Sequence, residues 1–202
     1  MQFEKRHFKF EVRSETDEKN GSYLRGRPIV YDSRTNLGDF DEIIKAGALD
    51  DADLSDVKFL INHNTMMIPL ARSKAGDDNS TMKFTVDKKG MDISVNIDSE
   101  RNADAKSLNS AVERGDLDGM SFMFTIDGQE WEGLETDHPT RTITKIGKVF
   151  EVSAVTFPAY ADTELSTRSK DILAAARQER KQENKSSDLE LEKLKAKYLY
   201  NI

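Results

Sequence analysis

The chain of 202 residues contains no cysteine. This absence excludes disulfides, zinc–thiolate centres and thiol nucleophiles, so covalent catalysis would have to use serine, threonine, lysine or a carboxylate. Histidine is scarce as well: His7, His63 and His138 are the three in the chain, and they lie far apart, outside any HExxH-like spacing. We therefore expect neither a metal centre nor a bound cofactor.

Long apolar runs and blocks of positive charge are also missing. No stretch approaches the ~20 apolar residues that cross a bilayer, and the first residues lack the apolar segment of a secretion signal. The net charge is −7, and the basic residues are interleaved with acidic ones. These patterns predict a soluble intracellular protein that binds neither nucleic acid nor membranes.

The composition changes along the chain. Hydrophobic residues make up 37% and charged residues 33%, which indicates that part of the chain lacks a core of its own. We expect a folded domain over residues 1–162. Residues 163–202 should form a charged, partly helical C-terminal extension, with a short helix over 166–180.

Period-two alternation of apolar and polar residues recurs up to residue 162 and predicts a mainly β domain with helices, of the α+β class. A hairpin is expected from 8–13 and 23–31 around Asn20-Gly21, and a clearer one from 82–86 and 91–97. The remaining elements would be an amphipathic stretch over 40–49, strands over 57–64, 119–126 and 142–160, and a helix over 101–114 capped by Asp98 or Ser99.

Three polar side chains stand out in these strands. Ser121 lies on the face of its strand opposite Met120 and Phe122, so its hydroxyl would be held by a stiff strand, as a nucleophile requires. The alternative is that this serine has no chemical role. His63 ends a strand at its rim, as a general base or as a structural histidine. Glu151 stands within an apolar run, where a buried carboxylate needs a histidine or an arginine as partner.

Five stretches in order carry a resemblance to a known family. They are Glu42–Leu49, Asn62-His63-Asn64, Lys89-Gly90-Met91, Gly119-Met120-Ser121-Phe122 and Glu151-Val152-Ser153-Ala154-Val155-Thr156-Phe157-Pro158-Ala159-Tyr160. With them, the chain resembles the HK97-type prohead (capsid maturation) serine proteases of tailed phages over residues 20–162. Ala46, Ala71 and Met123 stand where that family usually has proline, glycine and glycine, at turn and packing positions.

The resemblance implies a fold and an activity. The fold would be that of the herpesvirus assembly proteases, a closed or nearly closed antiparallel β-barrel of about seven strands surrounded by helices. The activity would be that of a serine endopeptidase in the host cytoplasm, inside the immature capsid (the prohead). It would cut scaffold or the scaffolding segment of the major capsid protein, and also itself. The herpesvirus analogy is compatible with a homodimer.

The resemblance also implies roles for the three side chains. Ser121 would be the nucleophile, His63 the general base, and Glu151 the acid that orients the imidazole. His138 is the alternative for the third role, because herpesvirus enzymes use a second histidine there. The sequence does not identify the donors of an oxyanion hole.

Two other classes of function remain open at this point. One is a non-enzymatic scaffolding or assembly protein of the capsid, in which the charged C-terminal segment is the active part. The other is a barrel that binds a small molecule in a pocket lined by Met66, Met67, Phe122 and Trp131.

Overall fold

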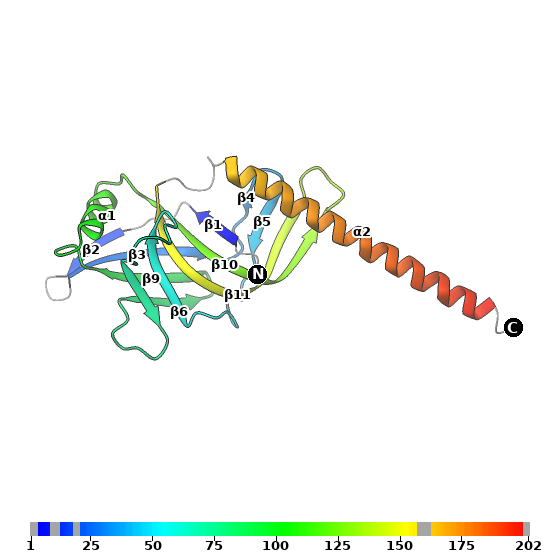
Figure 1. The fold of residues 1–202 in the computed structure, drawn as a ribbon, viewed down its shortest axis with the longest axis horizontal. Coiled ribbons are helices and arrows are strands. Elements are labelled where there is room, and N and C mark those ends of the chain that lie inside the picture. Colours follow the sequence, from blue (N-terminus) through cyan, green and yellow to red (C-terminus); the bar gives the residue numbers. More distant parts are fainter. Residues whose placement is uncertain (1–3, 9–12, 18–20, 157–162, 200–202) are drawn as a thin grey trace.

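The computed structural model describes residues 4–8, 13–17, 21–156 and 163–199 of the chain. Over these residues the strands form two sheets, and two helices accompany them (Figure 1). The larger sheet contains β1 (Glu4–Phe8), β4 (Thr35–Asn36), β5 (Asp41–Ile44), β6 (Asp56–Ile61), β7 (Ala71–Lys74), β10 (Gly119–Glu132) and β11 (Thr140–Val155). The smaller sheet contains β2 (Arg13–Asp17), β3 (Gly21–Val30), β8 (Met82–Asp87) and β9 (Gly90–Ile97). The helices are α1 (Ala103–Glu113) and α2 (Thr163–Leu199).

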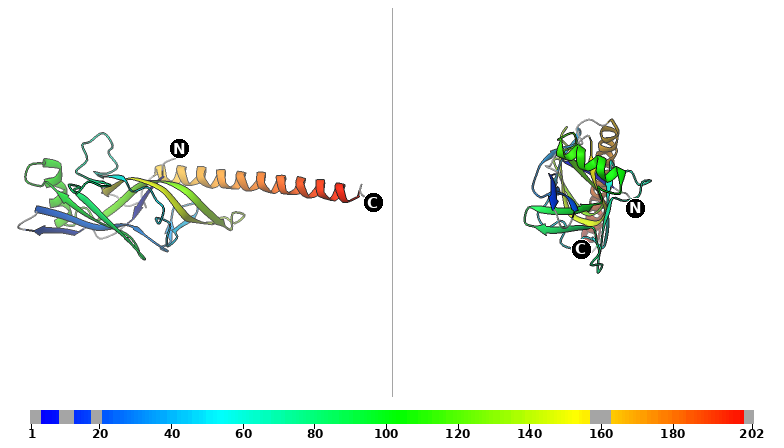
Figure 2. Two further views of the ribbon diagram at one scale, coloured as in Figure 1. Left: turned by 90° about the horizontal axis from the view of Figure 1, so that it is seen from below. Right: turned by 90° about the vertical axis from the view of Figure 1, so that its left-hand side faces the viewer.

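The prediction of a closed or nearly closed barrel surrounded by helices is wrong. The larger sheet runs β1-β10-β11-β5-β4, with β6 and β7 beside the other half of β11, and the smaller runs β2-β3-β9-β8. Closure of a barrel requires that edge strands pair with each other, and neither sheet closes in this way within the described residues. Helices α1 and α2 lie at opposite ends of the body and do not surround it (Figures 1 and 2).

The two sheets share one hydrophobic core. Leu24 and Val95 from the smaller sheet and Phe59, Phe122 and Ile146 from the larger are each at most 1% exposed and belong to the same cluster. Burial of such side chains contributes about 1.5–3 kcal/mol each, so this shared core accounts for the association of the sheets.

Strand β11 organises the larger sheet because it pairs with three others. It is antiparallel to β10 along most of its length, parallel to β5 over Thr140–Ile143, and parallel to β6 over Glu151–Ala154. The end of β6, the start of β10 and the end of β11 therefore meet at one edge of the sheet. Strand β1 pairs antiparallel with β10 on the side away from β11.

The structure contains one of the expected hairpins and a strand within the stretch 40–49. The hairpin expected over 82–97 is confirmed as β8 and β9, and its turn ends at Gly90, with φ of +138°. A Cβ atom there would lie 1.9 Å from the Ile29 carbonyl oxygen, so only glycine fits. The amphipathic stretch expected over 40–49 contributes a strand, β5.

The first hairpin and the first helix differ in detail from expectation. Strand β2 pairs with β3 around the turn, whereas β1 crosses to the larger sheet; residues 9–12 of the expected strand lie outside the described residues. Helix α1 is capped by Asn102, whose side chain accepts hydrogen bonds from the backbone N–H groups of Asp104 (2.9 Å) and Ala105 (3.2 Å). The expected caps, Asp98 and Ser99, lie one turn too early.

Helix α2 is much longer than the expected 166–180 helix. Leu173 and Ala176 pack against Phe40 and Leu134 in a second, smaller cluster, whereas every residue from 178 to 199 is exposed. The distal half projects from the body as a rod (Figure 1). Neither described helix has an apolar stretch long enough to span a membrane.

Candidate functional site

The meeting point of β6, β10 and β11 brings three of the predicted residues together. Ser121 is the third residue of β10, Glu151 lies near the end of β11, and His63 follows the end of β6. Ser121 Oγ lies 2.6 Å from His63 Nε2, and His63 Nδ1 lies 2.5 Å from Glu151 Oε1. A hydroxyl, an imidazole and a carboxylate thus form one hydrogen-bonded chain.

The strand register explains why Ser121 and Glu151 share a face. Ser121 lies opposite Ser153 in the antiparallel pair, and Glu151 precedes Ser153 by two residues, so the three side chains point to the same side of the sheet. The neighbours Met120, Phe122 and Val152 fill the other side. This face is buried too, because Ser121 is 0% and Glu151 2% exposed.

His63 reaches the other two through an unusual turn. We expected it to continue the strand of Val57, Phe59 and Ile61, but β6 ends at Ile61, and Asn62 (φ +51°) and His63 (φ +55°) both adopt the left-handed conformation. This conformation costs non-glycine residues about 1–3 kcal/mol each, although asparagine and histidine tolerate it better than most residues. The turn directs the imidazole, whose side chain is 7% exposed, towards the face of β10 and β11.

Hydrogen bonds to the end of β11 hold this turn. The Asn62 backbone N–H donates to the Ala154 carbonyl (2.9 Å), and Asn62 Oδ1 accepts from the Thr156 backbone N–H (2.9 Å). The His63 backbone N–H donates to Ser153 Oγ (3.1 Å). These contacts stabilise the strained backbone at the position where the imidazole is needed.

Glu151 is satisfied by hydrogen bonds although it is buried. Its Oε1 contacts His63 Nδ1, and its Oε2 accepts a short hydrogen bond from the hydroxyl of Ser153. Without such partners, burial of an ionised carboxylate would cost several kcal/mol. The partner of Glu151 is therefore a histidine and not an arginine, which answers the question left open by the sequence. A neutral imidazole with its proton on Nδ1 fits this arrangement, since Nε2 can then accept from Ser121.

His138, the alternative for the third position, lies elsewhere. It precedes β11, and its Nε2 is 2.9 Å from Asp41 Oδ1 and 3.4 Å from Asn36 Nδ2, at the opposite end of the strand from Glu151. The hydrogen bond from His138, with a further one from Arg34, holds the pKa of Asp41 below its ordinary value. His7 lies in β1, where the register sets it opposite Ser121.

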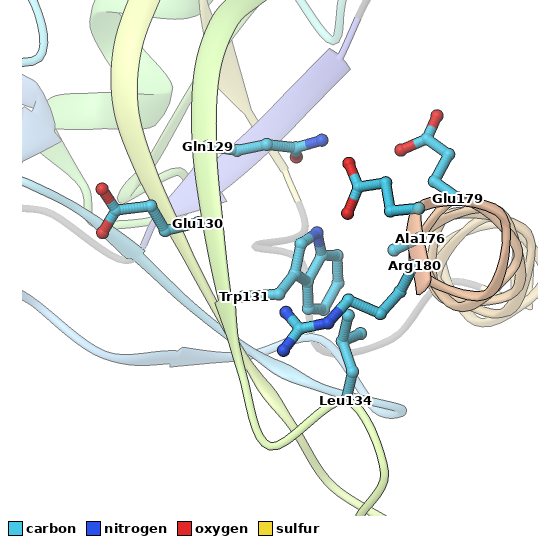
Figure 3. Close-up of a pocket in the computed structure, with 8 residues that line it drawn as sticks. Gln129, Glu130, Trp131, Leu134, Ala176, Glu179 and Arg180 are labelled. Atoms are coloured by element: carbon cyan, nitrogen blue, oxygen red, sulfur yellow. The ribbon is translucent and has the colours of Figure 1, made fainter. Parts of the chain in front are cut away.

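The residues of the suggested small-molecule barrel do not form a common pocket. Phe122 is fully buried beside Phe124, and Met66 is 92% exposed. Trp131 contacts Phe40 and lines an open pocket of about 370 Å³ between the β10–β11 hairpin and α2, towards which its ring points (Figure 3). Charged side chains such as Arg180 surround that pocket. Over the described residues, no cluster of three histidine or acidic side chains could hold a metal ion.

The hydrogen-bonded serine, histidine and glutamate have the arrangement of the catalytic triad in serine hydrolases. A family model described as caudovirus prohead serine protease matches residues 8–178. Because this match covers most of the chain, the protein belongs to the caudovirus prohead serine proteases.

Comparison with solved structures found the bacteriophage T4 capsid assembly protease as a similar chain. The two share 10% sequence identity, the match covers 75% of this chain and 98% of the other, and the TM-score is 0.35. A comparison with curated proteins found no match.

Sequence reasoning missed Ser153 and Asn62 as parts of the site. Ser153 looks like a small residue within the buried strand of Val152 and Ala154. One signal was present: it stands two residues after Glu151, which puts both side chains on one face of a strand. Nothing in the pattern around Asn62 indicated a left-handed turn.

Proposed function

We propose that this protein is an active serine endopeptidase that uses Ser121, His63 and Glu151. The single observation that supports this function best is the continuous hydrogen-bonded chain from Ser121 Oγ through both imidazole nitrogens to Glu151 Oε1. Membership of the prohead serine protease family supports the same reaction.

The mechanism follows from these contacts. Ser121 Oγ attacks the carbonyl carbon of the scissile peptide bond while its proton passes to His63 Nε2. His63 then returns the proton to the leaving amine, and water hydrolyses the resulting acyl-enzyme with His63 again as the base. Glu151 keeps the imidazole in the correct tautomer and stabilises the imidazolium that forms.

The substrates that we propose are phage capsid proteins. The resemblance to HK97-type enzymes and the family description both indicate capsid maturation, so scaffold or the scaffolding segment of the major capsid protein would be cut inside the prohead. Self-cleavage would occur in the same compartment.

The burial of Ser121 adds a requirement for movement. Its hydroxyl is 0% exposed, so a peptide can reach it only after a covering segment has moved. Strand β1 is the described segment that pairs with β10 opposite Ser121, on the side where an extended peptide could otherwise pair. We propose that β1 leaves this position before substrate binds.

We propose that the chain divides into a protease domain over residues 1–162 and a C-terminal extension over 163–202. The start of α2 at Thr163 and the exposure of every residue from 178 to 199 support this division. The first half of the extension packs on the domain, and the family match ends at residue 178, close to where this packing ends.

The test follows the intact mass of the protein over time, alone and with the major capsid protein of its own phage. We expect shortened products of the capsid protein, and none with Ser121→Ala, whose thermal unfolding should match that of the wild type. A wild-type chain that cuts neither protein but still promotes shell assembly would overturn the proposal in favour of a scaffolding role. Cutting by Ser121→Ala would overturn the choice of nucleophile.

A further inference from the structure

We propose that Ser153 is a positioning residue of this site, which fixes the general base and the orienting acid relative to each other. The inference rests on the proposed function, because it assigns Ser153 a role only through His63 and Glu151. Ser153 does not contact the atoms that react.

Ser153 connects the other two residues through a single oxygen atom. Its hydroxyl donates to Glu151 Oε2, and the same Oγ accepts from the backbone N–H of His63 at 3.1 Å. The imidazole of His63 meets the other oxygen of Glu151. The three residues therefore close a ring of contacts that includes the backbone of the base and both carboxylate oxygens of the acid.

The place of Ser153 in the sheet makes this ring rigid. It lies in the middle of three hydrogen-bonded strands, opposite Ser121 on β10 and opposite Leu60 on β6. It is 0% exposed, so no water competes for its hydroxyl. A short side chain that is enclosed in this way has little freedom, and its direction is set by the strand.

Ser153 Oγ satisfies two hydrogen-bonding requirements of the site. Glu151 needs a second donor because it is buried, and the left-handed backbone of His63 needs an acceptor for its N–H group. Alanine at this position would remove one of the two hydrogen bonds described for the Glu151 carboxylate and one of the three that hold the turn of His63. The acid and the base would then be fixed less firmly relative to each other.

The experiment measures covalent labelling of Ser121 in the full chain by a fluorophosphonate. In this reaction Ser121 Oγ bonds to phosphorus, the phosphorus–fluorine bond breaks, fluoride leaves and the proton passes to His63. Ser153→Ala should lower the maximal labelling rate by about 10- to 100-fold, as for loss of a hydrogen bond to a buried charge, with the probe concentration for half-maximal rate unchanged. Ser153→Cys keeps a similar shape and a weak donor, so its maximal labelling rate should lie between those of the wild type and Ser153→Ala.

A matched control separates positioning from general loss of structure. Ser169→Ala removes another buried hydroxyl that donates to a carboxylate, that of Asp39 at 2.5 Å, but far along the chain on α2. Its labelling rate should equal that of the wild type. In proton NMR spectra, the chemical shift of the His63 Nδ1–H proton should change in Ser153→Ala and stay the same in Ser169→Ala.

A double-mutant cycle tests whether Ser153 acts through Glu151. In a Glu151→Ala background, Ser153→Ala should lower the labelling rate much less than in the wild type, since the carboxylate that it orients is gone and only its contact with the His63 backbone remains. A full effect in that background would overturn the role through Glu151, and wild-type labelling by Ser153→Ala would overturn the positioning role altogether. If the wild type labels no faster than Ser121→Ala, the proposed function itself fails.

Discussion

Arg141 and Glu4, 137 positions apart in the chain, form a buried bidentate ion pair at the start of the N-terminal strand. Arg141 Nη1 lies 2.9 Å from Glu4 Oε2, and Nη2 lies 2.8 Å from Glu4 Oε1. Arg141 also contacts Glu42 Oε2 at 3.2 Å and donates to Gln129 Oε1 at 2.6 Å. One guanidinium therefore ties β1 and β5 to the central strand β11.

Replacement of Arg141 should destabilise the folded protein. Arg141→Met would remove the cation that pairs with the buried Glu4 and Glu42, so we expect the free energy of unfolding to fall by about 3–5 kcal/mol. Urea denaturation measures the change. The matched control is Arg25→Met, whose partner Glu15 is as exposed as Arg25 itself and which should cost less than about 1 kcal/mol. Equal effects of the two substitutions would contradict the importance of the buried cluster.

Replacement of His63 and replacement of Glu151 should lower the activity by different amounts. We expect His63→Ala to lower the labelling or cleavage rate by about 10⁶-fold, because Ser121 Oγ would lose the imidazole that accepts its proton. Glu151→Gln should lower it by about 10⁴-fold and leave a measurable remnant, since the amide still fills the space but holds the wrong tautomer. Steady-state kinetics distinguishes the two values. His138→Ala should leave the rate unchanged, and a large loss would show that the third role is wrongly assigned.

Removal of the first eight residues should expose the nucleophile. Strand β1 covers the edge of β10 at Ser121, and Arg141 would keep Glu42 as a partner after Glu4 is lost. We expect the fluorophosphonate labelling rate at Ser121 to rise several-fold, in proportion to the larger open population. A deletion of equal length at the C-terminus, residues 195–202, is the control and should have no effect. A lower or unchanged rate after the N-terminal deletion would show that β1 does not restrict access.

Two leucines of α2 should respond differently to the same substitution. Leu173 is 6% exposed in the cluster with Phe40 and Leu134, whereas Leu194 is 55% exposed on the projecting half. Leu173→Ala should lower the free energy of unfolding by about 2–3 kcal/mol, and Leu194→Ala by no more than about 0.5 kcal/mol. Thermal unfolding of both variants checks this. Similar melting temperatures would mean that the docked half of α2 does not stabilise the body.

The sequence was informative about the site mainly because five short stretches in order carried a family resemblance. From the residues alone, Ser121 and His63 each kept a structural alternative and only Glu151 required a partner; the structure brings the three together. The turn at Asn62 could not be foreseen, because it depends on the end of β11, more than 90 residues away. Ser153 was missed because its contact with His63 appears only when β6 and β11 are paired, although its position two residues after Glu151 was a signal in the sequence.

The pairing of the strands was harder to predict than which side chains would stand out. Alternating residues indicate strands but do not say which strands pair, and the parallel pairing of β11 with both β5 and β6 has no local signal. A barrel followed from the resemblance, whereas the strand pairing within the described part of the chain gives two open sheets. The length of α2 was underestimated because its distal residues bury nothing, and apolar periodicity is the signal by which helices are recognised.

The projecting half of α2 has a hydrodynamic consequence. At about 1.5 Å per residue, a helix of 37 residues is roughly 55 Å long, and its exposed end adds frictional drag without adding much mass. The 22.9 kDa chain should therefore sediment more slowly and show a larger maximum dimension in X-ray scattering than a sphere of equal mass. The same rod offers an added protease an exposed segment, so trimming should begin there and leave the two sheets intact.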